Sequence, residues 1–403
     1  MTLIYYETVR GDTPRRIAFK YGVSLHSLMS TNQWMDEQTY LWPGQIVLVE
    51  KRAPQKYKVQ PGDTLSIIAE AFGVSRLELL QANLHLLNKP CEAGVVIVIP
   101  PKSNDSRIVT LEGEYGYSNM MRHIERLTAT YPFVTAEVIG RSVMGKPIPA
   151  IRIGCGPRQV HFNGAVHANE WITSPCLMQF IEDYACALYR GVCWQHYNVT
   201  DWYNHNTLWI VPMVNPDGVE IVQEGVHPLH PYYHQLLEWN NGRRQFRRWK
   251  ANIRGVDLND QFPAHWEEER ERRGKCSPAP QDYSGPSPLS EPESVALAWL
   301  TDREKFDLAL SLHTQGREIY WNYRSFEPSY AEYWALRLAR AGGYRAVKLS
   351  GSDAGYKDWF IEKYGKPGFT VEAGTGINPL PLTDYEDIYA EVSLILAECL
   401  MLQ

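Results

Sequence analysis

The first hundred residues contain the same pattern twice, and this internal repeat limits the fold of that part of the chain more than any other feature. The stretch VRGDTPRRIAFKYGVSLHSLMSTNQ begins at Val9, and the similar stretch VQPGDTLSIIAEAFGVSRLELLQANLH begins at Val59. Each copy then ends in a run rich in β-branched residues, at 43–49 and 93–100, which is typical of a strand. A pattern repeated at this short period predicts one small supersecondary unit used twice.

The second copy indicates which elements each repeat contains. Asp63 or Thr64 can accept hydrogen bonds from the free backbone N–H groups at the start of a helix. The apolar residues that follow recur at helical spacing, and Gly73 can end that helix because glycine readily adopts positive φ. Ser75 is positioned to cap a second short helix. Each repeat is therefore predicted to be a strand, two helices and a strand around a thin core.

This βααβ pattern resembles the LysM module, and the resemblance covers residues 3–49 and 56–100. It implies two small domains, at residues 1–50 and 55–101, that bind glycans containing N-acetylglucosamine. The alternative is a structural spacer without a ligand. The polar, proline-led stretch PPKSNDSR, residues 100–107, is expected to link the repeats to a third domain at residues 108–403.

Beyond this linker, strands alternate with helices. Four apolar strand patterns are separated by turn residues and helical patterns. The predicted strands begin at residues 159, 206, 306 and 368, and the clearest helices lie at 174–190, around 293–302 and from about 384 onwards. This alternation favours an α/β domain with a largely parallel or mixed sheet. In such sheets, ligands bind at the carboxyl ends of the strands.

Side chains suited to a metal site lie at these strand ends. His167 and Glu170 follow the first predicted strand, in the sequence GAVHANEWIT. His313 stands at the end of the third strand, and Glu372 lies in the fourth. A catalytic zinc takes three protein ligands and keeps one open position, and the two histidines with Glu170 can supply those ligands. Burying the charge of Glu372 in an apolar strand is energetically costly. A role in proton transfer beside a cation would explain why a glutamate stands there.

A second pair with the same spacing, His265 and Glu268, lies in the charged run HWEEERERRGK. An HxxE pair alone is weak evidence for a metal site, because a chain with 12 histidines is expected to contain chance matches. A dense run of charge is more typical of a solvated helix or loop. We therefore expect this second pair not to bind a metal.

Five short motifs, HANEW, NPDG, GVDLN, SLHTQG and TVEAGT, appear in the order found in the metallocarboxypeptidases, the zinc enzymes related to carboxypeptidase A. The chain resembles this family over residues 108–403. The resemblance implies an α/β domain with a mixed sheet and flanking helices. It also implies one zinc ion per chain, held by His167, Glu170 and His313, because carboxypeptidase A has a zinc site of two histidines and a glutamate.

The same resemblance implies roles for residues around the metal. Glu372 would act as general base and then as general acid. A basic residue would polarise the scissile carbonyl, and in the sequence RRWKANIRG this residue is Lys250, with Arg248 as the close alternative.

Two departures from the family pattern concern the substrate. Where typical members have Asn-Arg, this chain has Asn259 followed by Asp260. The arginine of the family holds the terminal carboxylate of the substrate, whereas an acid can hold an ammonium group. Lys357, in GYKDWF, stands at the family position that points into the pocket for the residue after the scissile bond. A lysine there suits an acidic side chain.

A substrate residue that carries both an amine and a carboxylate away from the cleaved bond fits these departures. Meso-diaminopimelate, in bacterial peptidoglycan, has such an end. Two LysM-like repeats precede the domain that resembles the metallocarboxypeptidases. In this combination, the whole chain resembles the γ-D-glutamyl-L-diamino acid endopeptidases of spore-forming bacilli. This resemblance implies cleavage of the γ-D-glutamyl–meso-diaminopimelate bond of peptidoglycan stem peptides, while the repeats bind the glycan.

Other hypotheses remain open from the sequence. One is a carboxypeptidase or an N-acyl-amino-acid amidohydrolase that uses the same zinc frame on another substrate. Another is a catalytically silent peptidoglycan-binding protein, and a third is a structural spore-coat protein.

Composition argues against several further classes. The net charge of −6 argues against nucleic acid as a partner. No apolar run approaches the roughly 18 residues of a membrane span, and the N-terminal sequence does not match a conventional signal peptide. The seven cysteines form no CxxC pair and are expected to be reduced thiols. We therefore expect a cytoplasmic location, or one in the sporulating cell or spore.

Overall fold

The computed structural model of the chain describes residues 2–9, 12–21, 23, 25–36, 39–51, 55–74, 76–86, 91–100 and 107–402. Ser75, the predicted cap of a second helix, lies outside the described residues, as do residues 101–106 of the predicted linker. The chain divides into two compact units, one of residues 1–108 with 186–200 and the other of residues 109–185 with 201–403. The finer domain boundaries suggested by the sequence, at 50, 55, 101 and 108, stay predictions.

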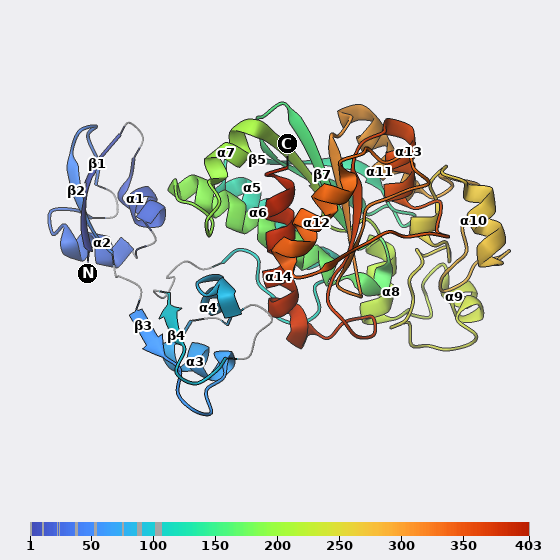
Figure 1. Cartoon of the computed structure of the whole chain (residues 1–403), viewed down its shortest axis with the longest axis horizontal. Coiled ribbons are helices and arrows are strands. Elements are labelled where there is room, and N and C mark those ends of the chain that lie inside the picture. The colour runs from blue at the N-terminus through green and yellow to red at the C-terminus, as the bar shows by residue number, and fades with distance from the viewer. Residues whose placement is uncertain are drawn as a thin grey trace. The chain divides into compact units, whose positions relative to one another are not determined.

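Both repeats have the predicted order of strand, helix, helix and strand (Figure 1). The two strands of each repeat pair in antiparallel orientation. The first repeat contains β1 (Thr2–Glu7), α1 (Pro14–Tyr21), α2 (Leu25–Thr31) and β2 (Ile46–Lys51). The second contains β3 (Gln55–Lys58), α3 (Leu65–Phe72), α4 (Arg76–Gln81), the short 3₁₀ helix η1 (Leu84–Leu86) and β4 (Val96–Ile99).

The ends of α3 follow from the local sequence. The hydroxyl of Thr64 accepts a hydrogen bond from the N–H of Ile67 at 3.2 Å. Gly73 has a φ of 63°, and its N–H donates to two carbonyl groups of the last turn. Of the two predicted cap residues, Thr64 is thus the one that caps the helix, while Asp63 accepts a hydrogen bond from the hydroxyl of Tyr57 at 2.7 Å.

A buried asparagine joins the second helix to the second strand in both repeats. The side-chain amide of Asn83 donates to the carbonyl oxygens of Leu79 and Val98 at 2.8 and 2.6 Å, and its oxygen accepts from the N–H of Val98 at 2.7 Å. Asn32 makes the same three bonds in the first repeat. Each of these small domains has a thin core, so hydrogen bonds add appreciably to its stability. The asparagine of each repeat pairs backbone groups that would be costly to bury unpaired, and it thereby stabilises the repeat.

The second unit is built on an eight-stranded mixed sheet with the order β11-β10-β12-β9-β7-β8-β6-β5. The four central strands are parallel, and they are the four strands that the sequence predicts: β12 (Gly368–Glu372), β9 (Leu308–His313), β7 (Arg158–Gly164) and β8 (Asn206–Val211). The antiparallel pairs are those of β12 with β10 (Glu318–Tyr320), of β8 with β6 (Pro147–Gly154), and of β6 with β5 (Val134–Arg141). Edge strand β11 (Arg345–Val347) pairs parallel with β10. The predicted α/β fold with a mixed sheet is confirmed.

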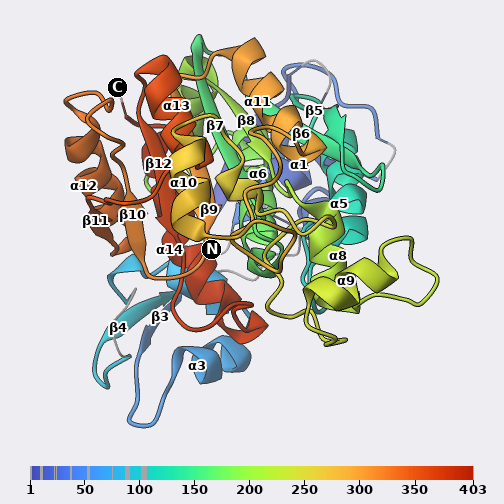
Figure 2. The same cartoon turned by 90° about the vertical axis from the view of Figure 1, so that its right-hand side faces the viewer.

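Helices cover both faces of this sheet (Figure 2). On one face, α11 (Pro292–Glu304) and α13 (Tyr356–Tyr364) share an apolar core with β5, β6 and β8. On the other face, Phe162 of β7 packs on Phe180 of α6 (Thr173–Arg190). Helix α14 (Tyr385–Cys399) contacts α6, because the hydroxyl of Tyr385 donates to Gln179, and α12 (Ala331–Gly342) lies beside α14. The remaining helices are α5 (Tyr117–Thr130), α7 (Val199–His205), α8 (Pro216–Glu224), α9 (Tyr233–Trp239) and α10 (Trp266–Arg273), with 3₁₀ turns η2 (Ala168–Glu170), η3 (Leu258–Asp260) and η4 (Leu382–Asp384).

This topology decides where chemistry can take place. Strands β7, β9 and β12 are parallel, so their carboxyl ends meet at one edge of the sheet. His167 follows the first of these strands, and His313 and Glu372 end the other two.

Two smaller expectations can be compared with the structure. None of the described helices has the length and apolar character that crossing a membrane requires. All seven cysteines are free thiols.

Candidate metal centre and active site

Three side chains form a compact group of the kind that binds metals. His313 ends β9, His167 stands three residues after β7, and Glu170 ends η2. His313 Nδ1 lies 3.1 Å from His167 Nδ1 and 2.9 Å from one carboxylate oxygen of Glu170. The other oxygen of Glu170 lies 2.9 Å from His167 Nδ1. All three residues are buried, and one ligand atom of each lies within 4.8 Å of the others, so the predicted convergence is confirmed.

The NPDG motif holds the loop that carries His167. The N–H of Asn215 donates to the carbonyl of Ala165 at 3.1 Å, and its side-chain amide donates to the carbonyls of Val166 at 3.2 Å and Ala251 at 3.1 Å. Its side-chain oxygen also caps α8. One buried asparagine therefore joins three separate segments, which gives the turn after β7 a single conformation.

The charges in this group favour a bound cation. Burial lowers the pKa of His167, but the carboxylates of Glu170 and Asp257 raise it to about 9, so this histidine keeps a proton at neutral pH when no metal is bound. Burial opposes ionisation of Glu170, yet the two histidines hold its pKa well below the ordinary value. Burial also lowers the pKa of His313, which favours the neutral imidazole that binds metals. Two imidazoles and an ionised carboxylate that stabilise a positive charge between them fit zinc.

Asp257 orients His167, and the sequence pattern did not indicate this role. His167 Nε2 lies 3.2 Å from Asp257 Oδ1. The carboxylate of Asp257 is itself fixed, because it accepts hydrogen bonds from the N–H groups of Asn259 and Asp282, each at 3.2 Å. A carboxylate on the second nitrogen of a metal-binding imidazole sets its tautomer and raises its basicity. The signal that would have found Asp257 is its place in the GVDLN motif.

Replacing Asp257 with asparagine should weaken zinc binding about 10- to 100-fold, because the amide removes the negative charge that holds the imidazole. The measurement is competition for zinc with a chromophoric chelator. Asp282→Asn is the matched control, since the carboxylate of Asp282 bonds Arg273 rather than His167. An Asp257→Asn variant with the zinc affinity of the Asp282→Asn variant would contradict this role.

Two further residues hold Glu170. The N–H of Thr314 donates to its carboxylate at 3.2 Å, and the side-chain amide of Asn378 donates to it at 3.3 Å. The hydroxyl of Thr314 in turn donates to the side-chain oxygen of Asn378 at 2.8 Å. Asn378 lies outside the five motifs, so nothing in the sequence pattern marked it.

Glu372 ends β12 beside the metal ligands. In the parallel pairing of β12 with β9, it aligns with His313, and its side chain is half-buried. Burial and the charge of Glu170 raise the pKa of Glu372 to about 8. A zinc ion beside it would oppose this shift, because a cation favours the ionised carboxylate. The position of Glu372 is the predicted one, and its role as general base stays a prediction.

Of the two basic residues suggested for polarising the carbonyl, Lys250 lies nearer the metal ligands. Its carbonyl oxygen accepts a hydrogen bond from the N–H of Ala168, in η2, at 2.9 Å. Burial lowers the pKa of Lys250, but the acids around it, chiefly Asp257, raise it above the ordinary value, so the ammonium stays charged. Arg248 is exposed, and its guanidinium donates to the carbonyl of Asn378.

Replacing Lys250 with alanine should therefore lower kcat about 100- to 1000-fold while the zinc content stays unchanged, because the charge that faces the developing oxyanion is lost. Arg248→Ala should lower kcat by less than about tenfold, since that side chain lies on the surface. Steady-state kinetics with metal analysis of both variants checks this. If Arg248→Ala proved the more damaging, the polarising role would belong to Arg248.

Asp260 is buried and already has a partner. Arg273 Nε lies 3.0 Å from Asp260 Oδ2, and Arg273 Nη2 donates to Oδ1 at 3.2 Å. Arg273 also pairs with Glu269 at 2.7 Å and with Asp282 at 3.0 Å. Burial, followed by the charge of Asp257, raises the pKa of Asp260 to about 7. An ammonium group that approaches Asp260 thus meets an acid that shares its charge with an arginine, and the sequence pattern did not indicate this pairing.

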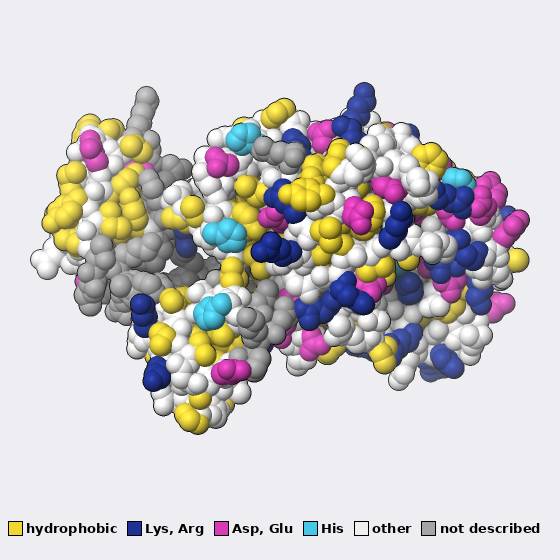
Figure 3. Space-filling view, viewed as in Figure 1, with side chains coloured by type: hydrophobic (Ala, Val, Ile, Leu, Met, Phe, Trp, Pro, Cys, Tyr) yellow, Lys and Arg dark blue, Asp and Glu magenta, His cyan; other side chains and the backbone are white. Residues whose placement is uncertain are grey.

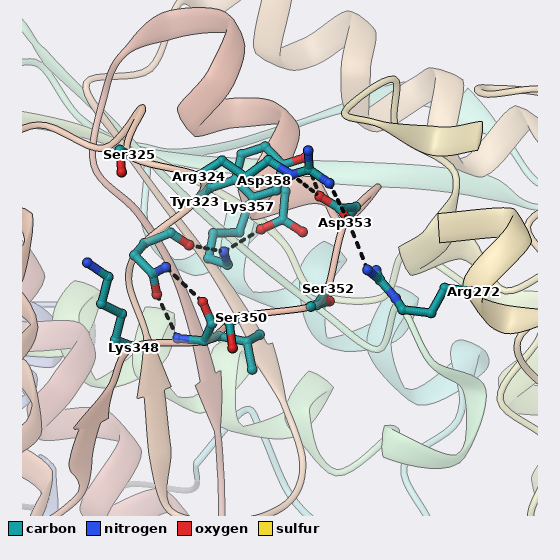
Figure 4. Close-up of a pocket in the computed structure, with 13 residues that line it drawn as sticks. Arg272, Tyr323, Arg324, Ser325, Lys348, Ser350, Ser352, Asp353, Lys357 and Asp358 are labelled. Atoms are coloured by element: carbon teal, nitrogen blue, oxygen red, sulfur yellow. Dashed lines mark hydrogen bonds and ion pairs between the residues drawn. The ribbon is translucent and has the colours of Figure 1, made fainter. Parts of the chain in front are cut away.

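Lys357 lines a pocket of about 570 Å³, shown in Figure 4. Its buried ammonium donates to the carbonyl of Asn322 at 2.8 Å and pairs with Asp358. On the other side of the pocket, arginines bind Asp353. Four basic and two acidic side chains line the pocket, and Arg272 and Arg324 also pair with Glu269 and Glu268. Lys348 has no acid partner among the described residues, so a negatively charged group of a ligand can bind there. The basic lining residues are Arg272, Arg324, Lys348 and Lys357, and the acidic ones are Asp353 and Asp358.

Asn259 connects this pocket to the acids beside the metal ligands. Its N–H donates to Asp257, and its side-chain amide lies near Gly355, which stands in the chain between the lining residues Asp353 and Lys357. A Cβ added at Gly355 would lie 3.7 Å from Asn259 Nδ2. The predicted substrate-binding residues Asn259, Asp260 and Lys357 therefore occupy one side of the site, whereas Arg248 lies elsewhere, beside Asn378.

The side chains of the second HxxE pair have other partners in the structure. His265 Nδ1 lies 3.0 Å from the hydroxyl of Tyr323, and Glu268 pairs with Arg324. Neither residue belongs to a possible metal-binding group within the described part of the chain. That this pair has no metal role stays a prediction. The described residues also bring Asp257, Asp260 and Asp282 together, but Arg273 already pairs with the last two.

Comparison with known families agrees with this geometry. The model of a family described as zinc carboxypeptidase matches residues 120–375, which is more than half of the chain. The chain belongs to the zinc carboxypeptidase family. It is a zinc metallopeptidase with one zinc ion per chain. Two LysM domains precede the peptidase domain, because the LysM model matches residues 6–50 and 57–100.

Relatives of this zinc carboxypeptidase include a bacterial enzyme. The chain is 45% identical over 285 residues to γ-D-glutamyl-L-diamino acid endopeptidase 1 of Lysinibacillus sphaericus, covering 71% of this chain and 72% of that protein. Solved structures support the fold. The thrombin activatable fibrinolysis inhibitor has a TM-score of 0.57 at 20% identity and covers 73% of this chain and 76% of its own. Carboxypeptidase A of Helicoverpa armigera has a TM-score of 0.54 at 20% identity, with 74% and 76% covered.

Proposed function

We propose that this zinc metallopeptidase hydrolyses the bond between γ-D-glutamate and meso-diaminopimelate in the stem peptides of peptidoglycan. The proposal rests on one observation: the site combines a metal centre with Asp260 and with the charged pocket that Lys357 lines. Diaminopimelate ends in an amine and a carboxylate. The basic side chains of the Lys357 pocket can bind the carboxylate, and Asp260, whose charge is shared with Arg273, can accept a hydrogen bond from the amine. The identity to an endopeptidase named for γ-D-glutamyl-L-diamino acids supports the same substrate.

The residues of the site have separate tasks in this reaction. His167, Glu170 and His313 hold the zinc ion, which, when bound, supplies Lewis acidity for carbonyl polarisation and water activation. Glu372 accepts the proton of the attacking water and then delivers it to the amine of diaminopimelate as the C–N bond breaks. Lys250 stabilises the negative charge that develops on the carbonyl oxygen.

The two LysM domains bring the peptidase domain to its substrate. In this proposal they bind the glycan strand that carries the stem peptides, and tethering raises the effective concentration of the peptide even when each domain binds weakly. Exposed hydrophobic side chains on the first domain support a role in sugar binding (Figure 3). Trp34, Tyr40 and Trp42 are 50%, 69% and 69% exposed, and such aromatic rings can pack on the apolar face of a sugar. Among the described residues of the second domain, the large hydrophobic side chains that are exposed, Ile67 and Val96, are aliphatic. The first domain should therefore bind the glycan more strongly.

The setting of the reaction is part of the proposal. We place the enzyme in the cytoplasm, or in the sporulating cell or spore. Fluorescence microscopy of a tagged chain through sporulation would test this, and an even signal in vegetative cells that never enters the spore compartment would exclude the spore location.

The substrate proposal is tested with the purified holoenzyme and the tripeptide L-Ala-γ-D-Glu-meso-diaminopimelate, with release of L-Ala-D-Glu followed by mass spectrometry. A matched tripeptide with L-lysine as third residue lacks the distal carboxylate and should be cleaved much more slowly. Cleavage of both tripeptides at the same rate would show that the Lys357 pocket does not recognise the distal carboxylate. Trimming of ordinary C-terminal residues or N-acyl amino acids, without cleavage of either tripeptide, would favour a carboxypeptidase or amidohydrolase instead.

A further inference from the structure

A second pocket, of about 660 Å³, lies on the surface of the peptidase domain and is lined by four arginines, Arg243, Arg244, Arg247 and Arg248. Asn378 forms part of its wall. We call it the arginine pocket. The side-chain amide of Asn240 donates to the carbonyls of Arg243 and Gln245 at 2.8 and 3.0 Å, so the loop that carries the arginines has a defined conformation.

The arginine pocket adjoins the metal centre through Asn378. The side chain of Asn378 donates to Glu170, a predicted zinc ligand, at 3.3 Å. Its backbone carbonyl accepts a hydrogen bond from Arg248 inside the pocket. A ligand group in this pocket is therefore separated from the zinc ligands by one residue.

Most of the positive charge in the arginine pocket is not neutralised. Arg247 pairs with Glu114 at 2.6 Å. Within the described part of the chain, no carboxylate pairs with Arg243, Arg244 or Arg248. Guanidinium groups gathered without acids repel one another, and their planar donors match a carboxylate. The pocket is thus suited to an anionic group of a ligand.

The two charged pockets lie on separate sides of the site. The Lys357 pocket and the arginine pocket share no lining residue. A peptidase needs one side for the amine that leaves and another for the acyl group that stays. Because the proposed function assigns the Lys357 pocket to diaminopimelate, the arginine pocket is the side available to the acyl group.

We infer that the arginine pocket binds the free α-carboxylate of the D-glutamyl residue, and that the enzyme therefore selects γ-linked D-glutamate over D-isoglutamine. This inference rests on the proposed function. The bond to diaminopimelate is made through the γ-carbonyl of D-glutamate. The α-carboxylate of this residue is therefore a free anion in the substrate. In D-isoglutamine the same group is an uncharged amide, which cannot pair with a guanidinium.

Two tripeptides that differ only at this group test the inference with the zinc-loaded, full-length enzyme. They are L-Ala-γ-D-Glu-meso-diaminopimelate and its D-isoglutamine counterpart. The wild-type enzyme should prefer the D-glutamyl peptide by about tenfold or more in kcat/KM, mainly through KM. The double variant Arg243→Gln/Arg244→Gln should lose this preference while it cleaves the D-isoglutamyl peptide as the wild type does. Arg340→Gln, which removes an exposed arginine of α12, is the matched control and should keep the preference.

The outcomes separate the inference from the function it rests on. Equal cleavage of both peptides by the wild type overturns the inference and leaves the proposed function intact. A double variant that loses activity on both peptides to the same extent also overturns it, because the arginines would then support the fold or the reaction rather than recognise the carboxylate. Cleavage of neither peptide by the wild type overturns the proposed function and the inference together.

Discussion

Glu372→Gln should abolish peptide hydrolysis and leave the zinc in place. Glutamine has nearly the same size as glutamate, so the end of β12 should keep its structure, but the amide cannot accept the proton of the attacking water. General acid–base catalysis contributes about 10²- to 10⁴-fold, and kcat should fall by at least that factor because Glu372 is proposed to serve in both proton transfers. The measurements are kcat with the diaminopimelate tripeptide and the zinc content of the purified variant.

Glu318 provides the matched control for this substitution. It aligns with Glu372 across the antiparallel pair of β10 and β12, and it bonds Tyr320 and Arg345 rather than a zinc ligand. Glu318→Gln should keep most of the wild-type activity. If Glu372→Gln bound zinc normally and still turned over within tenfold of the wild-type rate, another group would have to be the general base.

His313→Ala should lose both zinc and activity. The imidazole is one of three ligands, and the two that remain cannot complete the tetrahedral site with an open position that a catalytic zinc requires. Activity should fall to the level of a chelator-treated wild type, which retains all residues of the site but lacks the metal. Because a bound metal stabilises the native state by mass action, the variant should also lose the rise in Tm that added zinc gives the wild type.

The other HxxE pair supplies the control for this second prediction. His265 has the same spacing to an acid as His167, yet its imidazole contacts Tyr323 and its α10 neighbour Glu268 pairs with Arg324. His265→Ala should therefore bind one zinc ion per chain and keep its activity. A His313→Ala protein that still bound one zinc ion with wild-type affinity would mean that the metal has another ligand set.

The four central strands of the sheet could be predicted from the sequence for a physical reason. A parallel strand with both faces covered reads as a continuous apolar run, and β9 and β8 are buried along their whole length. The strands outside this centre give weaker patterns. β10 and β11 have three residues each, and β5 is exposed over most of its length. Such strands pair because a neighbour is available, which local sequence does not reveal.

The candidate site divides in the same way. His167, Glu170, His313 and Glu372 follow from motifs at the ends of predicted strands, since parallel strands bring their carboxyl ends together. Asn378 could not be found, because it reaches Glu170 from a loop 208 residues away in the sequence. The sequence shows an aspartate, Asp260, where the family has an arginine. It does not show that Arg273 pairs with Asp260, because an ion pair between η3 and α10 depends on how those segments pack.

The sequence by itself determined the two βααβ repeats and the four parallel strands at the centre of the peptidase sheet. It also determined which candidate metal ligands and which glutamate lie at the carboxyl ends of these strands. These features depend on local spacing and on the burial that an apolar run requires. Only the tertiary structure decided which charges are paired and which are free. It pairs Asp260 with Arg273 and leaves three arginines without acids beside Asn378, within the described part of the chain. Charges interact over distance in space rather than along the chain, so their balance is decided only when the segments that carry them have packed.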